Sequence, residues 1–207
     1  RDSSTSRGLG DVYKRQFPML GNHNIENALA AITVAYNFNI DPEIIKKALE
    51  SFSGVKRRLS KIYEKNNIVF YDDYAHHPTE IKETIKALKS SKGRLISVIQ
   101  PHRYSRLRDN YHKFIKSFSK SDIVLILPVY EAGEEKIENF TSEILASDIS
   151  QQGPSKATYF KDFSILKSEI KKILKPNDTV IFMGAGSIST WCNKFAKEMI
   201  LKDQNNE

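Results

Sequence analysis

The chain has 207 residues and is short of several features that would assign it to a common class of protein. It has one cysteine, Cys192, which excludes an internal disulfide and suits a reducing cytoplasm. No apolar run approaches the roughly 20 residues that a membrane helix needs. No Gly-x-x-x-x-Gly-Lys-Ser/Thr phosphate loop occurs, so if the protein uses ATP the phosphate cradle lies outside this sequence. Hydrophobic residues make up 40% of the chain, which is enough for a packed globular core.

Arginine is also scarce. After residue 16 the chain has 22 Lys and 6 Arg, and five of those six lie in two clusters, one formed by Arg57 and Arg58 and the other by Arg103, Arg106 and Arg108. The planar guanidinium binds carboxylates and phosphates in a fork that Lys cannot offer, so we expect oxyanion contacts at these clusters, with ordinary surface arginines as the alternative. The lysines are spread along helix faces without an interleaved aromatic stripe, which does not favour nucleic-acid binding.

Residues 1–16 show neither helical nor strand periodicity and fit nothing that follows. We interpret them as a foreign leader, expect them to be disordered, and exclude them from fold reasoning. They hold four basic and two acidic residues, so without them the formal net charge falls from +7 to +5. That modest charge indicates a solvated surface and remains compatible with a small anionic substrate.

Residues 17–57 predict a pair of helices. The run from Ala28 to Tyr36 is apolar on nearly every side, so a helix there is expected to be buried. A second helix is expected to start at Asp41-Pro42-Glu43, which supplies an N-cap and a first-turn Pro. Two helices cannot surround the first one, so we expect this segment to be the end of a domain whose body lies upstream.

From residue 58 onward, strand and helix patterns alternate. Strands are expected near 60–64, 67–72, 94–99, 122–127, 157–160 and 178–183, and helices near 79–90, 104–118, 141–149, 162–174 and 187–200. This order predicts an α/β fold with a Rossmann-like, mostly parallel sheet flanked by helices, ending in a tail at 204–207. Polar stretches at 72–80 and 100–106 follow two of the strands, and ligands bind at this carboxyl edge in open parallel sheets.

The turn Gly184-Ala-Gly186 follows the last predicted strand. It lacks the third glycine of a dinucleotide-binding fingerprint and has too little chain after it for the ribose-binding acid. We therefore interpret it as a tight turn with some affinity for anions, and not as an NAD site.

His76, His77 and His102 could suggest a metal site, but adjacent histidines on a short turn rarely both face one ion, and no acid or thiol completes the usual ligand spacing. We expect no metal site in this chain. Asp72 and Asp73 leave their strand on opposite sides, so one can face a ligand while the other holds the turn. We expect Cys192 to be a small buried hydrophobe on a helix, with a nucleophile as the alternative.

A series of motifs in register resembles the Mur ligase family: Gly21-Asn-His-Asn-x-x-Asn27-Ala, Phe52-x-Gly-Val-Lys-Arg-Arg58, Asp72-Asp-Tyr-Ala-His-His-Pro-Thr-Glu80, Gln100-Pro-His-Arg-Tyr-Ser-Arg106, Val129-Tyr-x-Ala-Gly-Glu134 and Met183-Gly-Ala-Gly-Ser-Ile188. The resemblance covers residues 17 to about 200 and is strongest to the members that join L-alanine to UDP-N-acetylmuramate in peptidoglycan synthesis. It implies that residues 17–57 end the central ATP-binding domain and that residues 58–203 form the Mur ligase C-terminal domain.

The resemblance also implies a reaction and a set of site residues. ATP phosphorylates the lactyl carboxylate of UDP-N-acetylmuramate, the amine of L-alanine attacks the acyl phosphate, and Mg²⁺ is held by residues expected upstream of this chain. The implied ATP-binding residues are His23, Asn24, Asn27, Arg58, Asp73 and Tyr74, with Arg58 at the γ-phosphate and Asp73 at the ribose. The implied substrate-binding residues are His76, His102, Arg103, Arg106 and Tyr130, and the implied catalytic residues are Arg58, His76 and His102.

The sequence departs from the family pattern in lacking the UDP-binding domain, the phosphate loop and the magnesium ligands. We therefore expect this chain alone neither to hydrolyse ATP nor to ligate. One alternative is the sister ligase that attaches a whole tripeptide in cell-wall recycling; it shares the Asp-x-Ala-His-His-Pro turn and should lack Gln-Pro-His-Arg-Tyr-Ser-Arg. Another is a non-catalytic nucleotide-binding module. The oligomeric state stays open.

Overall fold

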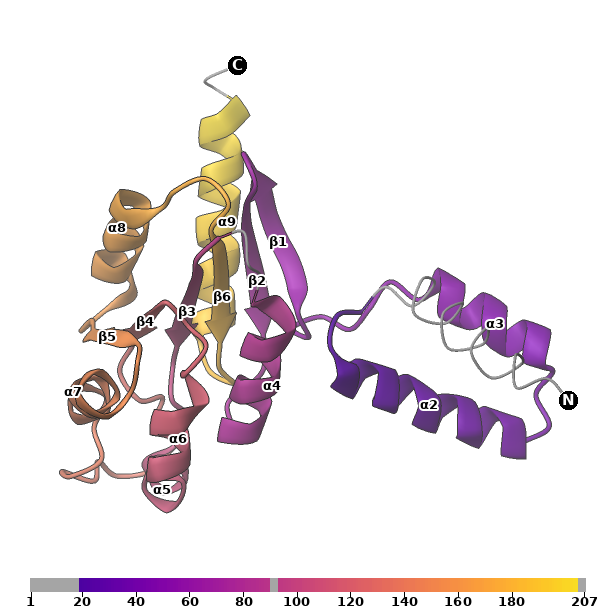
Figure 1. Cartoon of the computed structure of the whole chain (residues 1–207), viewed down its shortest axis with the longest axis horizontal. Coiled ribbons are helices and arrows are strands. Elements are labelled where there is room, and N and C mark those ends of the chain that lie inside the picture. Colours follow the sequence, from indigo (N-terminus) through magenta and orange to yellow (C-terminus); the bar gives the residue numbers. More distant parts are fainter. Residues whose placement is uncertain (1–18, 90–92, 205–207) are drawn as a thin grey trace, which may run out of the picture. The chain divides into compact units, whose positions relative to one another are not determined.

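The computed structural model describes residues 19–89 and 93–204 and divides into two compact units, with the boundary between Val55 and Lys56 (Figure 1). Residues 1–16, expected to be a foreign leader, and 205–207 of the expected tail lie outside the described residues. The domain boundary predicted after residue 57 lies two residues beyond this division. The assignment of the units to named domains of a larger enzyme stays a prediction, and each unit is described here by itself.

The first unit contains helices α2 (Asn22–Asn37) and α3 (Pro42–Ser51). The start of α3 is as predicted: the Asp41 carboxylate accepts a hydrogen bond of 2.8 Å from the backbone N–H of Glu43, and Pro42 occupies the first turn. Helix α2 begins after Gly21, whose φ of 94° favours glycine. The sequence therefore determines both helix starts through local chemistry.

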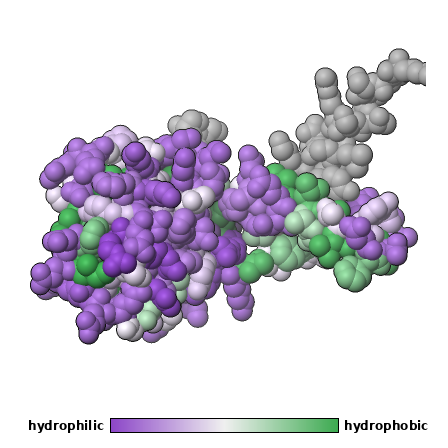
Figure 2. All heavy atoms as spheres, turned by 90° about the horizontal axis from the view of Figure 1, so that it is seen from below, coloured by the Kyte–Doolittle hydropathy of each residue, from purple (hydrophilic) through white to green (hydrophobic). Residues whose placement is uncertain are grey.

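The apolar surface of α2 is exposed. Leu29, Val34 and Tyr36 are 61%, 57% and 67% exposed, and hydrophobic side chains gather on this unit in Figure 2. Within the described residues of this unit the helix is therefore not buried, because α3 covers only one of its sides, and burial against a domain body upstream stays a prediction.

The second unit is a six-stranded sheet covered by helices on both faces, in the order β1-β2-β6-β3-β4-β5. Its strands are β1 (Ser60–Lys65), β2 (Ile68–Asp73), β3 (Leu95–Ile99), β4 (Ile123–Ile126), β5 (Lys156–Tyr159) and β6 (Thr179–Met183). Its helices are α4 (Pro78–Leu88), α5 (Tyr104–Asp109), α6 (Tyr111–Ser117), α7 (Ser142–Gln152), α8 (Phe163–Ile173) and α9 (Ile188–Gln204). Strand β1 is antiparallel to β2 and the other pairs are parallel, which confirms the predicted α/β fold.

Alternate residues of the buried strands separate the core into two layers. Leu95 and Ile99 of β3 face a cluster with α4, α6 and α7, whereas Ile96 and Val98 face a cluster with α8 and α9. Cys192 of α9 is fully buried in the second cluster, as predicted. Burial raises the pKa of its thiol, which makes this residue a poor nucleophile.

The predicted helix over 104–118 is two helices that meet at Asn110. Asn110 has φ −121° and ψ 16°, and its side-chain amide donates to the backbone carbonyl of Arg106 at 3.2 Å. The Asn side chain competes in this way with the helix for backbone hydrogen-bonding groups. The periodicity of the flanking apolar residues continues across the break, so the pattern gives no sign of it. The prediction of one continuous helix was therefore wrong at this residue.

Strand β6 lies between β2 and β3, although it is the last strand in the chain. The connection from β2 to β3 through α4 passes over it. The carboxyl ends of β2, β6, β3 and β4 therefore lie side by side, and the turns that follow them meet at one edge of the sheet.

The pair formed by Arg94 and Asp178 connects the start of β3 to the turn before β6. Asp178 is 1% exposed and accepts from Nε and Nη2 of Arg94 at 3.0 and 2.5 Å and from the backbone N–H of Lys175 at 2.8 Å. Asp178→Ala leaves the half-buried cation unpaired, so we expect the free energy of unfolding to fall by about 3 kcal/mol in urea titrations. Asp109→Ala, which breaks the exposed pair with Arg108, should cost less than about 1 kcal/mol. Equal losses would contradict this account.

Candidate active site

The turn after β2 carries Tyr74, His76 and His77 and leads into α4. The carboxylate of Glu80 accepts from the backbone N–H groups of His76 and His77 at 3.1 and 3.2 Å, and Pro78 begins the helix. Burial opposes ionisation of Glu80, but these amide contacts and nearby positive charge outweigh it, so its pKa lies below the ordinary value. Glu80 therefore sets the shape of the turn, a role that the sequence alone did not assign.

Asp72 and Asp73 point to opposite sides of β2, as predicted, and both hold the structure together. Asp73 accepts from the backbone N–H groups of Leu59 and Ala75 at 2.8 and 2.7 Å. Asp72 accepts from the hydroxyl of Ser189 in α9. Both aspartates are almost fully buried. Asp73 thus anchors the 57–59 segment to the strand, and its contact with a ribose stays a prediction.

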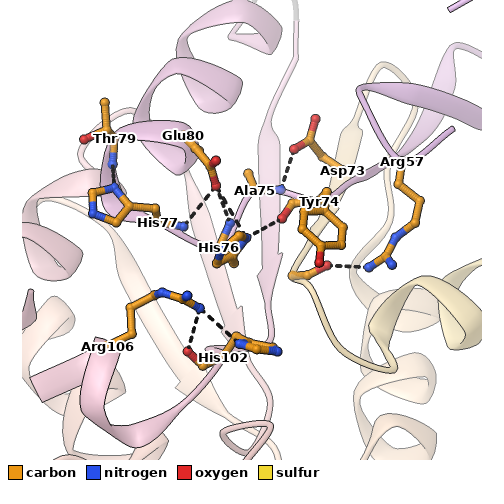
Figure 3. A network of polar contacts seen from close by, with 11 residues as sticks. Arg57, Asp73, Tyr74, Ala75, His76, His77, Thr79, Glu80, His102 and Arg106 are labelled. Atoms are coloured by element: carbon orange, nitrogen blue, oxygen red, sulfur yellow. Dashed lines mark hydrogen bonds and ion pairs between the residues drawn. The ribbon is translucent and has the colours of Figure 1, made fainter. Parts of the chain in front are cut away.

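Arg57 packs against the turn after β2. Its Nη2 donates to the carbonyl of Gly184 at 2.8 Å, its guanidinium carbon lies 4.5 Å from the ring centroid of Tyr74, and its own carbonyl accepts from the N–H of Tyr74 at 2.7 Å (Figure 3). Arg58 is exposed, with its guanidinium carbon 5.7 Å from the same centroid. The pair of arginines in the sequence indicated that the candidate site includes this segment. It did not reveal that Arg57 would contact Gly184 and Tyr74 and so support the structure.

The turns after β3 and β4 are joined by backbone contacts. Tyr130 donates through its N–H to the carbonyl of Pro101, and its own carbonyl accepts from the N–H of Arg103, both at 2.8 Å. The ring of Tyr130 stacks on that of His102 with centroids 5.4 Å apart and an interplanar angle of 16°. The structure therefore brings together residues that are far apart in the sequence.

A row of rings results, formed by Tyr74, His76, His102 and Tyr130. Successive centroids are 5.3, 5.8 and 5.4 Å apart. Burial lowers the pKa of His102, and the positive charge of Arg106 lowers it further. The ring row is the centre of the candidate site and contains four of the predicted site residues. Figure 3 shows three of them, Tyr74, His76 and His102.

The two predicted arginines of this turn differ in their surroundings. Arg103 is exposed and has φ 69° and ψ 133°. This backbone conformation is strained for any residue other than glycine. Arg106 is partly buried, and its Nη1 lies 3.0 Å from Nδ1 of His102 and donates to the carbonyl of the same residue at 3.2 Å. Glu134, in the turn after β4, accepts from the N–H and hydroxyl of Ser105 and so caps the start of α5.

The protein-family model "Mur ligase, glutamate ligase domain" matches residues 57–186, which include the whole ring row. The chain belongs to the Mur ligase family.

Relatives of this Mur ligase chain carry the name UDP-N-acetylmuramate–L-alanine ligase. The UDP-N-acetylmuramate–L-alanine ligase of Mesorhizobium japonicum is 42% identical over 89% of this chain and 40% of its own length. The ligase of the same name from Rhizobium etli is 44% identical over 88% of this chain and 39% of its own length. The chain therefore spans about two fifths of the curated relatives that it matches.

Solved structures agree with the fold. The UDP-N-acetylmuramate–alanine ligase MurC of Thermotoga maritima has a TM-score of 0.69 and 25% identity over 90% of this chain and 39% of its own. The MurF ligase of the same organism, solved in complex with ADP, has a TM-score of 0.65 over 89% of this chain and 40% of its own, and at 18% identity it supports the fold alone.

The remaining predicted residues of this Mur ligase chain lie on α2, in the first unit. Asn24 is 5% exposed and its side-chain amide donates to the carbonyl of Leu20 at 2.7 Å, which fixes the start of the helix. Asn27 is exposed, and Nδ1 of His23 is buried without a hydrogen-bond partner among the residues that the structure describes. Their contact with a nucleotide stays a prediction.

Across residues 19–89 and 93–204, no group of three or more His, Cys, Asp or Glu side chains could hold a metal ion. Within the same residues, the helices are too short or too polar to cross a membrane.

A cavity of about 520 Å³ lies on the side of Tyr130 toward α8 and α9. Its lining includes Gln100, Phe163, Ser187 and Trp191. Gln100 is 3% exposed, and its Oε1 accepts from the N–H of Ile188 at 3.1 Å, which ties the end of β3 to α9. Gln100 is a further residue of the site whose structural role the sequence did not reveal.

Gly186 allows the ring of Tyr130 to sit at the edge of the sheet. A Cβ at this position would lie 2.6 Å from Cγ of Tyr130 and 2.7 Å from Oε1 of Gln100. We expect Gly186→Ala to displace the ring and to lower the free energy of unfolding by about 1–3 kcal/mol in urea titrations. Gly133→Ala is a control for a position with open space, where only the backbone at φ 84° is strained. An unchanged Tyr130 ring resonance in Gly186→Ala would contradict the prediction.

Proposed function

We propose that this chain provides the amino-acid-binding part of an ATP-dependent ligase that joins L-alanine to the lactyl carboxylate of UDP-N-acetylmuramate through an acyl phosphate. One observation carries the proposal: the ring row and Arg103 converge at the carboxyl edge of the sheet in a chain 42–44% identical to enzymes named for that reaction. We assign the reaction to the cytoplasm, a reducing compartment that suits a chain with one cysteine.

Each residue then has a task that its surroundings support. Arg103, exposed beside the ring row, pairs with the carboxylate of L-alanine. Arg58, also exposed, reaches the γ-phosphate. In the first unit, the exposed amide of Asn27 offers both a donor and an acceptor to adenine. Nδ1 of His23, which has no hydrogen-bond partner within residues 19–89 and 93–204, fits a polar ligand nearby.

The protein does little covalent work in this proposal. ATP supplies the activated carboxylate, and the chain orients the amine, offsets charge and excludes water. Mg²⁺ is expected to be held by residues upstream of this chain. Arg57 and Asp73 hold the 57–59 segment against the sheet, which keeps Arg58 at the edge where the ring row lies.

A fusion tests the proposal. Residues 19–207 are joined to the upstream part of the Mesorhizobium japonicum ligase, and phosphate release from ATP is measured with UDP-N-acetylmuramate and either L-alanine or the tripeptide. Release that depends on L-alanine supports the proposal. Release that depends on the tripeptide favours the recycling ligase, and a folded fusion that is silent with both favours a non-catalytic domain.

A further inference from the structure

The hydrogen-bond partners of His76 determine which of its ring nitrogens carries a proton. Nδ1 lies 2.9 Å from the carbonyl oxygen of Tyr74 and 3.5 Å from the carboxylate of Glu80. Both neighbours can only accept, because Glu80 also accepts from two backbone amides and is ionised. The proton must therefore be on Nδ1, which leaves the lone pair of the neutral ring on Nε2.

Nε2 of His76 can meet a ligand. Within residues 19–89 and 93–204 it has no hydrogen-bond partner, and the His76 side chain is 18% exposed. The ring lies beside His102 in the ring row, with centroids 5.8 Å apart (Figure 3). The nitrogen that is left to accept a proton thus belongs to a ring that lies next to the ring of His102.

His102 has the opposite arrangement. Its Nδ1 lies 3.0 Å from Nη1 of Arg106, and a guanidinium can only donate. Nδ1 must accept, so the ring is neutral and carries its proton on Nε2. The stack on Tyr130 and the second contact of Arg106, to the backbone carbonyl of His102, hold the ring in this orientation. Burial and the nearby arginine charge lower the pKa of His102, which also favours the neutral ring.

We propose that the two histidines are fixed as opposite tautomers, His76 with a proton-accepting Nε2 and His102 with a proton-donating Nε2–H, and that Arg106 is the positioning residue for His102. This assigns Arg106 a task other than binding the amino-acid carboxylate, which is left to Arg103. The catalytic roles that follow rest on the proposed ligase function; the tautomers themselves do not.

In the ligation step, the α-ammonium of the amino acid gives one proton to Nε2 of His76. The released lone pair forms the C–N bond at the acyl phosphate carbon, and His102 Nε2–H donates a hydrogen bond to the oxygen on which charge develops. The C–O bond to phosphate then breaks. The second amine proton leaves with the phosphate, and the third stays on the amide nitrogen.

Long-range ¹H–¹⁵N spectra of the histidine rings of the whole chain test the tautomers directly. The rings are assigned by single His→Gln substitutions. We expect the pattern of an Nδ1–H ring for His76 and of an Nε2–H ring for His102. The same tautomer on both rings, or Nδ1–H on His102, would overturn the proposal.

Arg106→Gln tests the positioning role. We expect His102 to lose its preference for the Nε2–H form and its titration midpoint to rise, whereas Arg108→Gln, on the same helix but exposed and paired with Asp109, leaves both unchanged. A His102 spectrum that is the same in Arg106→Gln and the unsubstituted chain would contradict the role.

In the fusion, Arg106→Gln should lower kcat at least tenfold with little change in the KM for L-alanine, whereas Arg103→Gln should mainly raise that KM. The reverse pattern would show that Arg106, and not Arg103, binds the amino-acid carboxylate. A fusion that does not use L-alanine overturns the proposed function and the proton transfer with it, and the ring spectra still decide the tautomers.

Discussion

Arg103→Gly should make the second unit more stable and the fusion far less active. The backbone of Arg103 lies at φ 69° and ψ 133°, a region that glycine occupies without steric cost and other residues occupy at about 1–3 kcal/mol. Glycine also loses more chain entropy on folding, so the net gain in the free energy of unfolding should be about 1 kcal/mol. The same change removes the guanidinium proposed to bind the amino-acid carboxylate, and kcat/KM for L-alanine should fall about a hundredfold or more.

Arg103→Ala separates the two effects. It removes the same charge but keeps a Cβ at the strained position, so activity should fall to a similar level without the gain in stability. Urea titration of the chain and L-alanine kinetics of the fusion measure the two quantities. If Arg103→Gly lost stability, or kept its activity, the combination of strain and function assigned to this residue would be wrong.

Phe182→Ala should remove a large part of the stability of the second unit. Phe182 is fully buried in β6, with its ring centroid 5.8 Å from that of Phe70, 6.4 Å from that of Phe163 and 6.5 Å from that of Phe195. Truncation leaves a cavity among side chains of β2, α8 and α9, so the free energy of unfolding should fall by about 4 kcal/mol. Urea titration followed by tyrosine and tryptophan fluorescence measures it.

Two other variants show whether the loss of stability comes from the buried volume of the Phe182 ring. Phe182→Leu keeps most of the volume and should cost about 1–2 kcal/mol, which leaves a folded protein to measure even if the alanine variant does not fold. Phe38→Ala removes a ring that is 77% exposed and should change the free energy of unfolding by less than about 0.5 kcal/mol. Similar losses for Phe182→Ala and Phe38→Ala would show that the buried rings do not form the core described.

The strands and their polar ends were predictable because local chemistry determines them. The strand Leu95–Ile99 is apolar except for Ser97, and Pro78 is typical of the start of a helix such as α4. The polar stretches after β2 and β3 indicated the sheet edge at which the candidate site lies. Position within the sheet was not predictable in the same way. Strand β6 inserts between β2 and β3, and only this placement brings Gly184 to the side chain of Arg57.

The contacts that shape the site depend on neighbours distant in the chain. Glu134 caps α5 through Ser105, and Arg57 bonds to a carbonyl 127 residues further on; neither contact has a spacing that a sequence pattern reveals. The break at Asn110 was missed for a local reason, because a single Asn within an amphipathic run is weak evidence against a helix.

The most direct test of the proposed ligase reaction is the product that the fusion makes. The reaction mixture containing ATP, UDP-N-acetylmuramate and L-alanine is analysed by mass spectrometry, with ADP and phosphate quantified in the same samples. The account predicts a single amide between L-alanine and the lactyl carboxylate, formed in equal amounts with ADP and phosphate, and lost in Arg103→Ala but kept in Arg108→Ala. ATP hydrolysis without the amide, or an amide formed equally well by Arg103→Ala, would contradict it.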